Sequence, residues 1–307
     1  MNCAFVYPGQ GAQAIGMGAD FFESPLARRA NEVCGFDLIK AMREGPEELL
    51  QSTSICQPAL FLHSALVLEA LQKKNALPVA EYHLGLSLGE YSALYGSGAM
   101  SFDDVMGALV VRGKAMQEAC TLVPSGMVSV LGLDEEQILK VCDAAREDGV
   151  LQAANFNAPS QIVISGDLKA LERAMEHLKA AGARRSMALP VAGAFHSPLM
   201  QPAAAALKAH LKKCTIGPAC AKVISNVSAE AHNPQTVAEA LVAQITAPVR
   251  WSQSIENLIQ HRGVTSFCEW GTGKVLSGLI KRVSKDVELC AAGTLAECEA
   301  CPCVARP

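Results

Sequence analysis

Short apolar runs and longer segments of helical periodicity alternate along most of this chain. A buried strand is predicted for residues 3–7, which are all apolar and precede a glycine-rich turn. Further strands are predicted over 82–84, 222–226 and 264–269. Between them, helices are expected over 36–43, 46–50, 58–71, 90–95, 237–245 and from the Ser101 capping box to about Cys120.

The middle of the chain has its own order of predicted elements. Strands are expected over 127–131, 150–154, 161–165 and 184–189, and helices over 134–146 and 168–181. This β-α-β-β-α-β order is that of a ferredoxin-like unit. We therefore predict a small domain at 125–189, inserted in a large domain that is formed by 1–124 and 190–290.

Composition and charge exclude several classes of protein. Half of the 307 residues are apolar, so the chain can bury a sizeable core. The net charge of −4 offers no footprint for nucleic acid. No apolar run approaches the roughly 20 residues of a membrane span, so we expect no membrane segment. The loop Gly271-Thr272-Gly273-Lys274-Val275 lacks the spacing and the hydroxyl of a P-loop, which argues against a nucleotide triphosphatase.

Twelve cysteines are scattered along the chain, mostly inside apolar segments. This distribution is typical of small buried residues in a reducing compartment. Near the end, Cys298, Cys301 and Cys303 follow Cys290, but only one spacing is Cys-x-x-Cys and no histidine lies nearby. We therefore predict no metal site, and we expect residues 291–307 to be a poorly ordered tail.

The pentapeptide Gly85-Leu86-Ser87-Leu88-Gly89 fits the Gly-x-Ser-x-Gly pattern of a nucleophile elbow. In that turn a strand reverses into a helix, and the two glycines let the backbones approach closely. The predicted strand at 82–84 and helix at 90–95 supply this context. An ordinary turn is the alternative interpretation of the same residues.

A serine nucleophile needs a base, and imidazole has a suitable pKa. His196 is the best candidate among the seven histidines, because it lies in a loop before a proline-led helix, where a histidine has no packing role. His83 is constrained by the predicted strand. His210, His232 and His261 lie in polar segments and are expected to be exposed.

One arginine falls on the apolar stripe of the helix that follows the elbow. Arg112 lies three residues after Leu109 and four before Met116, which predicts a buried guanidinium. Its charge requires an anion, either a protein carboxylate or a substrate carboxylate held by two hydrogen bonds. Gln10 follows the first strand in a glycine-rich loop, which either presents backbone N–H groups to a ligand or is a plain turn.

Seven motifs occur in one order along the chain. They are Tyr7-Pro8-Gly9-Gln10-Gly11, the elbow with Glu90-Tyr91-Ser92-Ala93-Leu94, Arg112-Gly113-Lys114, Asn155-Phe156-Asn157-Ala158-Pro159, Phe195-His196, Pro248-Val249-Arg250-Trp251 and Gly273-Lys274-Val275-Leu276. Together they resemble the malonyl-CoA:acyl-carrier-protein transacylases of type II fatty acid synthesis, over roughly residues 3–285. The resemblance implies an α/β fold, with an α/β-hydrolase-like large domain around a parallel sheet and the ferredoxin-like insertion.

The resemblance also implies a reaction in two halves. Ser87 would attack the thioester of malonyl-CoA while His196 takes its proton, and the phosphopantetheine thiol of acyl carrier protein would then accept the malonyl group. The backbone carbonyl of Gln244 would orient His196 in place of an acid. The backbone N–H groups of Gln10 and Leu88 would form the oxyanion hole.

Further residues around the acyl group follow from the resemblance. Arg112 would bind the malonyl carboxylate. A phenylalanine directly before the histidine, here Phe195, is associated with specificity for malonyl over methylmalonyl substrates. Met116 and Asn157 are also expected in the substrate site. Malonyl-CoA and acyl carrier protein are the expected partners of a monomer that uses no cofactor.

The chain departs from the resemblance at Leu86, where most members of the family carry histidine. Leu86 and the run Val191-Ala192-Gly193-Ala194-Phe195-His196 resemble the plastid branch, so we expect a plastid stroma, with a bacterial cytoplasm as the alternative. Two other functions remain open. A thioesterase or lipase has the same elbow, and a non-catalytic partner would use the pocket only to bind acyl chains.

Overall fold

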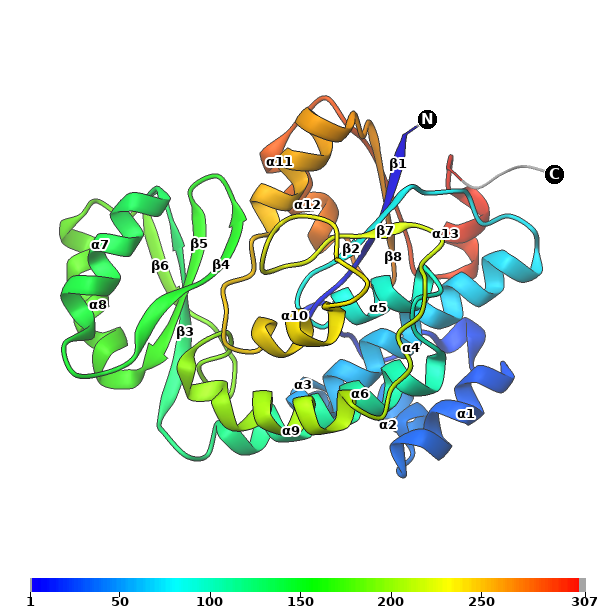
Figure 1. The fold of residues 1–307 in the computed structure, drawn as a ribbon, viewed down its shortest axis with the longest axis horizontal. Helices are drawn as coiled ribbons and strands as arrows, with labels where there is room; N and C mark the ends of the chain where they lie inside the picture. The colour runs from blue at the N-terminus through cyan, green and yellow to red at the C-terminus, as the bar shows by residue number, and fades with distance from the viewer. Residues whose placement is uncertain (1, 304–307) are drawn as a thin grey trace.

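Two β-sheets organise the chain (Figure 1). In the computed structural model, which describes residues 2–303, every strand pair of the larger sheet is parallel. Its strand order is β7-β2-β1-β8-β9, formed by β1 (Cys3–Tyr7), β2 (Tyr82–Gly85), β7 (Lys222–Val223), β8 (Ser266–Trp270) and β9 (Glu288–Ala292). The predicted α/β fold with a parallel sheet core is confirmed.

Helices cover both faces of the parallel sheet, so its strands are buried on both sides. Ala4 and Val6 of β1 pack with α11 (Trp251–Arg262) and α12 (Val275–Val283). Phe5 and Tyr7 face the other way, into the core formed with α4 (Thr53–Lys73), α5 (Gly89–Gly96) and α6 (Phe102–Ala119). This two-sided burial explains why the strands read as continuous apolar runs.

Smaller helices surround this core. The predicted helices at 36–43 and 46–50 correspond to α2 and α3, whereas the pattern did not single out α1. Their bounds are α1 (Pro25–Cys34), α2 (Leu38–Glu44), α3 (Glu47–Gln51), α9 (Gln201–Leu211) and α10 (Val237–Gln244), with 3-10 turns at η1 (Ala19–Phe21) and η2 (Pro198–Met200).

The helix α4 is longer than the sequence predicted. It begins at Thr53 rather than Pro58, because the carbonyl of Ser52 accepts the N–H groups of Ile55 and Cys56 at 3.0 and 2.8 Å. Among residues 2–303 it is the one helix whose length and composition would suit a membrane span, which corrects the expectation that no apolar run approaches one. In this structure 78% of its apolar window is buried in the protein.

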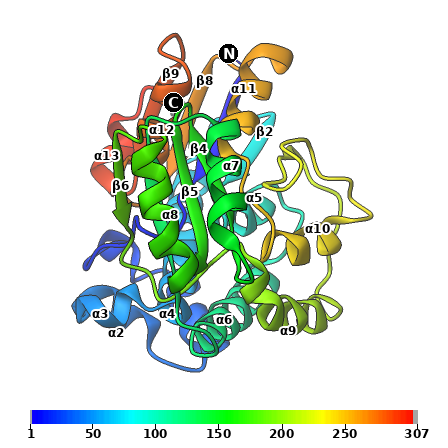
Figure 2. The ribbon, with the colours of Figure 1, turned by 90° about the vertical axis from the view of Figure 1, so that its left-hand side faces the viewer.

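The second sheet has the predicted β-α-β-β-α-β order, and its strand pairs are antiparallel. Figure 2 shows α7 and α8 side by side across one face of it. The sheet order is β4-β5-β3-β6, formed by β3 (Ser125–Leu131), α7 (Glu135–Arg146), β4 (Leu151–Ala158), β5 (Gln161–Asp167), α8 (Leu168–Ala180) and β6 (Arg185–Ala188). The domain division at 125–189 agrees with these limits and stays a prediction.

Residues 291–303 differ from the expected poorly ordered tail. The strand β9 pairs along its length with β8, which brings Cys290 opposite Cys268. Thr294 and Glu297 then form a capping box that begins α13 (Leu295–Ala300). Edge pairing and a capped helix therefore order this segment, and the expectation was wrong for 291–303. Residues 304–307 lie outside the described part of the chain.

The turn between β2 and α5 brings backbones into contact that only glycine permits. A Cβ atom on Gly85 would lie 2.0 Å from the carbonyl carbon and oxygen of Gly89. A Cβ atom on Gly89 would in turn lie 2.3 Å from the carbonyl oxygen of Tyr7. Since both obstacles are backbone atoms, no side chain can move aside to make room.

Replacing Gly85 with alanine should therefore destabilise the protein by about 2 kcal/mol or more, because the backbone of the turn must shift. Gly278→Ala is the matched control, since a Cβ atom in the helix α12 meets nothing within 4 Å and alanine favours helix. Urea denaturation of both variants measures the difference. Equal stabilities for the two variants would contradict the close approach.

Candidate active site

Ser87 lies at the tip of the turn between β2 and α5, in a left-handed conformation with φ of 55°. A residue other than glycine is strained there and needs support from its surroundings. Asn226 supplies it, because its Oδ1 accepts the Ser87 N–H at 2.7 Å and its Nδ2 donates to the Gly85 carbonyl at 2.8 Å. The turn is thereby held open with the serine side chain in a cavity.

The structure brings His196 and the carbonyl of Gln244 to Ser87. The Nε2 atom of His196 lies 2.9 Å from Ser87 Oγ, and its Nδ1 atom lies 2.8 Å from the Gln244 backbone oxygen. No carboxylate among residues 2–303 hydrogen-bonds to this imidazole ring. A backbone carbonyl accepts only, so Nδ1 carries the proton and Nε2 is free to accept one from the serine.

The loop that carries His196 is held by the small sheet. Gln152 of β4 donates from Nε2 to the backbone carbonyl of His196 at 2.6 Å. Ser165 of β5 donates from Oγ to the carbonyl of Phe195 at 2.7 Å. The large sheet therefore positions the serine, and the small sheet fixes the loop of its histidine partner.

The electrostatic environment keeps His196 neutral. Burial, reinforced by the positive charge of Arg112, lowers the pKa of His196 to about 4, while the Gln244 carbonyl opposes this shift. The imidazole is therefore uncharged near pH 7, which is the form that can take a proton from a hydroxyl.

Arg112 of α6 is fully buried beside the serine, and its partners are all neutral. Its Nη2 donates to Ser87 Oγ at 3.0 Å and to the side-chain oxygen of Gln244 at 2.9 Å, and its Nη1 donates to Gln57 Oε1 at 2.6 Å. The ring of Tyr91 lies 5.6 Å from its guanidinium carbon. Burial lowers the pKa of Arg112.

The sequence left two possible partners open for Arg112, a protein carboxylate or a substrate carboxylate. The structure pairs it with no carboxylate among the described residues. None of the ion pairs formed among residues 2–303 includes this arginine. Its charge is therefore available to an anion that enters the cavity next to the serine hydroxyl.

A buried carboxylate supports the site from behind. Glu90 accepts hydrogen bonds from Gln244 Nε2 at 2.7 Å and from the Asn226 N–H at 3.0 Å, and its other oxygen lies 2.6 Å from His232 Nε2. Gln244 Nε2 also donates to the Ser87 carbonyl at 2.9 Å. The expectation that His232 is exposed was wrong, because its side chain is 5% exposed against Glu90.

Sequence reasoning missed four supporting residues: Gln57, Glu90, Asn226 and His232. Two of them carried a signal, because Gln57 and Glu90 are polar residues within apolar helical segments and so need buried partners. Asn226 and His232 reach the site from a distant loop, and nothing in their local sequence indicates it.

The cavity in front of Ser87 has a volume of about 140 Å³. Besides Ser87 and Leu86, the lining includes seven predicted site residues: Gln10, Leu88, Arg112, Met116, Asn157, Phe195 and His196. The N–H groups of Gln10 and Leu88 have no acceptor among the described residues. Both are therefore free to donate to an oxygen atom in this cavity.

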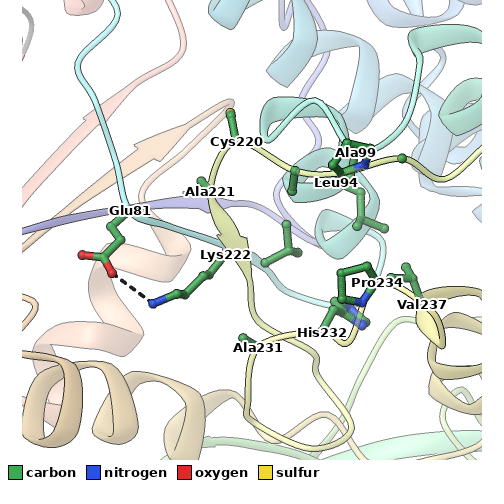
Figure 3. A pocket seen from close by; sticks show the side chains of 14 residues that line it. Glu81, Leu94, Ala99, Cys220, Ala221, Lys222, Ala231, His232, Pro234 and Val237 are labelled. Carbon is green, nitrogen blue, oxygen red and sulfur yellow. Dashed lines mark hydrogen bonds and ion pairs between the residues drawn. The ribbon is translucent and has the colours of Figure 1, made fainter.

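A separate cavity of about 370 Å³ is lined by residues 217–223 and by part of the segment 231–237 (Figure 3). Lys222 and Glu81 form an exposed ion pair of 3.2 Å at its edge, and His232 lines it. It contains no nucleophile paired with a base, so the smaller cavity is the candidate active site.

Comparison with known proteins agrees with this geometry. Residues 4–291 match the acyl transferase domain family. The malonyl CoA-acyl carrier protein transacylase of Bacillus subtilis (strain 168) is 44% identical over 92% of this chain and 90% of its own length. The corresponding structure from Coxiella burnetii has a TM-score of 0.93 and 34% identity, covering 98% of this chain and 96% of that one.

A further solved structure is a type II PKS acyl-carrier protein in complex with its malonyl-transacylase. It has a TM-score of 0.91 at 36% identity and covers 98% of both chains. The identities and coverage leave no large part of the chain unmatched. The chain belongs to the acyl transferase domain family and, within it, to the malonyl-CoA:acyl carrier protein transacylases.

Proposed function

We propose that this protein transfers a malonyl group from malonyl-CoA to the phosphopantetheine thiol of acyl carrier protein, in fatty acid biosynthesis. The observation that carries this proposal is the buried Arg112, which lies 3.0 Å from Ser87 Oγ and has only neutral partners. An acyl group bound to that serine would lie next to the Arg112 guanidinium. A malonyl group ends in a carboxylate, which can accept two hydrogen bonds from this guanidinium.

In the first half-reaction, Ser87 Oγ attacks the thioester carbonyl and His196 Nε2 takes its proton. Charge that develops on the carbonyl oxygen is stabilised by the N–H groups of Gln10 and Leu88, and one such donor is typically worth a factor of about 100 or more in rate. His196 then gives its proton to the departing sulfur of coenzyme A. The Gln244 carbonyl holds the ring throughout, which is supported by the 2.8 Å contact to Nδ1.

In the second half-reaction, the phosphopantetheine thiol gives its proton to His196 and attacks the malonyl-serine ester. The same two N–H groups stabilise the second tetrahedral intermediate, and the proton returns to Ser87 Oγ as the new thioester forms. Because both halves use the same groups, the site needs no metal or organic cofactor for this chemistry.

Specificity for the acyl group comes from the walls of the cavity. Phe195 is buried in the wall next to His196, where its ring leaves little space for a methyl branch in a volume of about 140 Å³. Met116 lines the same cavity. The side-chain oxygen of Asn157 is buried and has no hydrogen-bond partner among the described residues, so it is available to a donor on the substrate.

The competing function is a serine hydrolase, either a thioesterase or a lipase. An arginine beside the nucleophile does not suit a lipid acyl chain, and His196 has a carbonyl partner where a hydrolase usually supplies an acid. These two features favour transfer.

The carrier protein and the compartment belong to the same proposal. The complex of a relative with an acyl-carrier protein supports this class of partner. The organisms named above are bacteria, which supports a bacterial-type cytoplasm and gives no support to the plastid stroma. We also propose that the protein acts as a monomer.

Incubation with radiolabelled malonyl-CoA should label Ser87, and addition of holo acyl carrier protein should then remove the label as malonyl carrier protein. Ser87→Ala should give no labelled protein, because no other hydroxyl takes part. Gel electrophoresis and product analysis measure both steps. Steady release of free malonate without transfer would support the hydrolase, and absence of any adduct would support a non-catalytic partner.

Replacing Arg112 with alanine should lower kcat/KM for malonyl-CoA by roughly 100- to 10,000-fold, as expected for the loss of two hydrogen bonds to a carboxylate. Acetyl-CoA has no such carboxylate and should be affected far less, which also shows that the variant is folded. Arg112→Lys keeps the charge but not the planar fork, so its kcat/KM for malonyl-CoA should lie between those of the wild type and Arg112→Ala. An equal loss for both substrates would show that Arg112 does not recognise the acyl group.

The acid limb of kcat/KM should lie near the pKa of about 4 that burial gives His196, instead of the ordinary value of about 6.5. Below that pH the imidazole is protonated and cannot accept the serine proton, so activity falls as pH falls. In Arg112→Ala, measured with acetyl-CoA, the limb should move to higher pH because a repelling charge is gone. Circular dichroism at each pH checks that the protein stays folded. An acid limb near pH 6.5 in the wild type would contradict the buried surroundings of His196 that lower its pKa.

A further inference from the structure

Five cysteines from distant parts of the chain meet at one edge region of the parallel sheet. Cys3, Cys268 and Cys290 come from the adjacent strands β1, β8 and β9, and Cys301 and Cys303 follow α13. All but Cys303 are buried, and Cys303 is half-buried. The sequence prediction of no metal site considered only the tail, since Cys3 and Cys268 are 265 residues apart.

The sulfur atoms form one continuous group. Those of Cys268, Cys290 and Cys303 all lie within 4.8 Å of one another. The sulfur of Cys3 lies 3.6 Å from that of Cys268, and the sulfur of Cys301 lies 2.9 Å from that of Cys290. Each of the two outer thiols therefore adjoins the central triad of Cys268, Cys290 and Cys303.

Most of these separations come close to those that a thiophilic metal ion requires. Zinc binds thiolates at about 2.3 Å in tetrahedral geometry, so two sulfur ligands of one ion lie about 3.8 Å apart. The 3.6 Å between Cys3 and Cys268 is close to that value, and the triad requires shifts of an ångström or less. The 2.9 Å between Cys301 and Cys290 is shorter than that value, so Cys301 would have to move away from Cys290 to serve as the fourth ligand.

We propose that this cysteine cluster is a structural zinc site. Cys268, Cys290 and Cys303 supply three thiolates, and either Cys3 or Cys301 completes the four. Each coordinating thiol gives its proton to solvent when the ion binds. Cys303 is the partly exposed member and marks the side from which an ion can enter.

The site would fasten the end of the chain to the core. Cys303 is the ligand that follows α13, whereas Cys268 and Cys290 belong to the sheet, so one ion links the tail to β8 and β9. The cluster does not belong to the catalytic machinery, because Cys3 begins β1 and the loop with Gln10 follows the opposite end of that strand. Metal binding should therefore raise the unfolding temperature by several degrees and leave malonyl transfer unchanged.

The test uses the full chain, kept reduced with a phosphine and freed of metal with a chelator. Titration with Co²⁺ should give thiolate charge-transfer absorption and the d–d bands of a tetrahedral site at one ion per chain, and Zn²⁺ should displace it. Cys303→Ser should weaken binding by at least the roughly 100-fold that loss of a second-shell partner can cost. Cys220→Ser is the control, because this exposed cysteine lies outside the cluster.

Cys3→Ser and Cys301→Ser identify the fourth ligand, since only one of them should weaken binding as Cys303→Ser does. Retained transferase activity in Cys303→Ser shows that this variant is folded. The proposal is overturned if the reduced wild-type protein gives no tetrahedral cobalt spectrum, or if Cys303→Ser binds as tightly as Cys220→Ser. A disulfide between Cys290 and Cys301 in protein isolated without oxidant would overturn it as well.

Discussion

The guanidinium of Arg112 is buried away from water. Among the described residues it donates hydrogen bonds to side-chain oxygens of Gln57, Gln244 and Ser87, and it lies over the ring of Tyr91. Burying a charge without a counter-ion is costly, and these dipoles offset only part of that cost. The remaining positive potential has two effects. Under the proposed function it attracts the substrate carboxylate towards the serine, and it adds to burial in lowering the pKa of His196. In the proposed mechanism this one charge therefore serves both recognition of the acyl group and, together with burial, the neutral state of the base.

The two sheets divide the work of placing the reacting groups. Ser87 depends on the strand and helix of the large sheet, and its strained backbone is supported by Asn226. His196 depends on Gln152 and Ser165 from the small sheet. The 2.9 Å contact between serine and histidine is therefore also a measure of how the two sheets sit against each other. Glu90 stiffens this arrangement, since it binds both Asn226 and Gln244.

Short motifs and helical spacing were enough to predict the parts of the site that neighbouring residues in the sequence determine. The elbow around Ser87 and the buried position of Arg112 followed from motif and helical spacing, and the contact between Gln244 and His196 followed from resemblance. The links of Asn226 and His232 to the elbow span more than a hundred residues, so no periodicity reveals them. The tail was misjudged for the same reason. Its order depends on the pairing of β9 with β8, two strands that meet only after folding.

The crystal structure of the malonyl-serine intermediate, trapped with malonyl-CoA in the absence of carrier protein, tests the central claim most directly. The account predicts that the malonyl carboxylate accepts two short hydrogen bonds from the guanidinium of Arg112. The carbonyl oxygen of the serine ester should lie between the N–H groups of Gln10 and Leu88. A carboxylate that points to solvent, with Arg112 still bound only to its neutral partners, would contradict it.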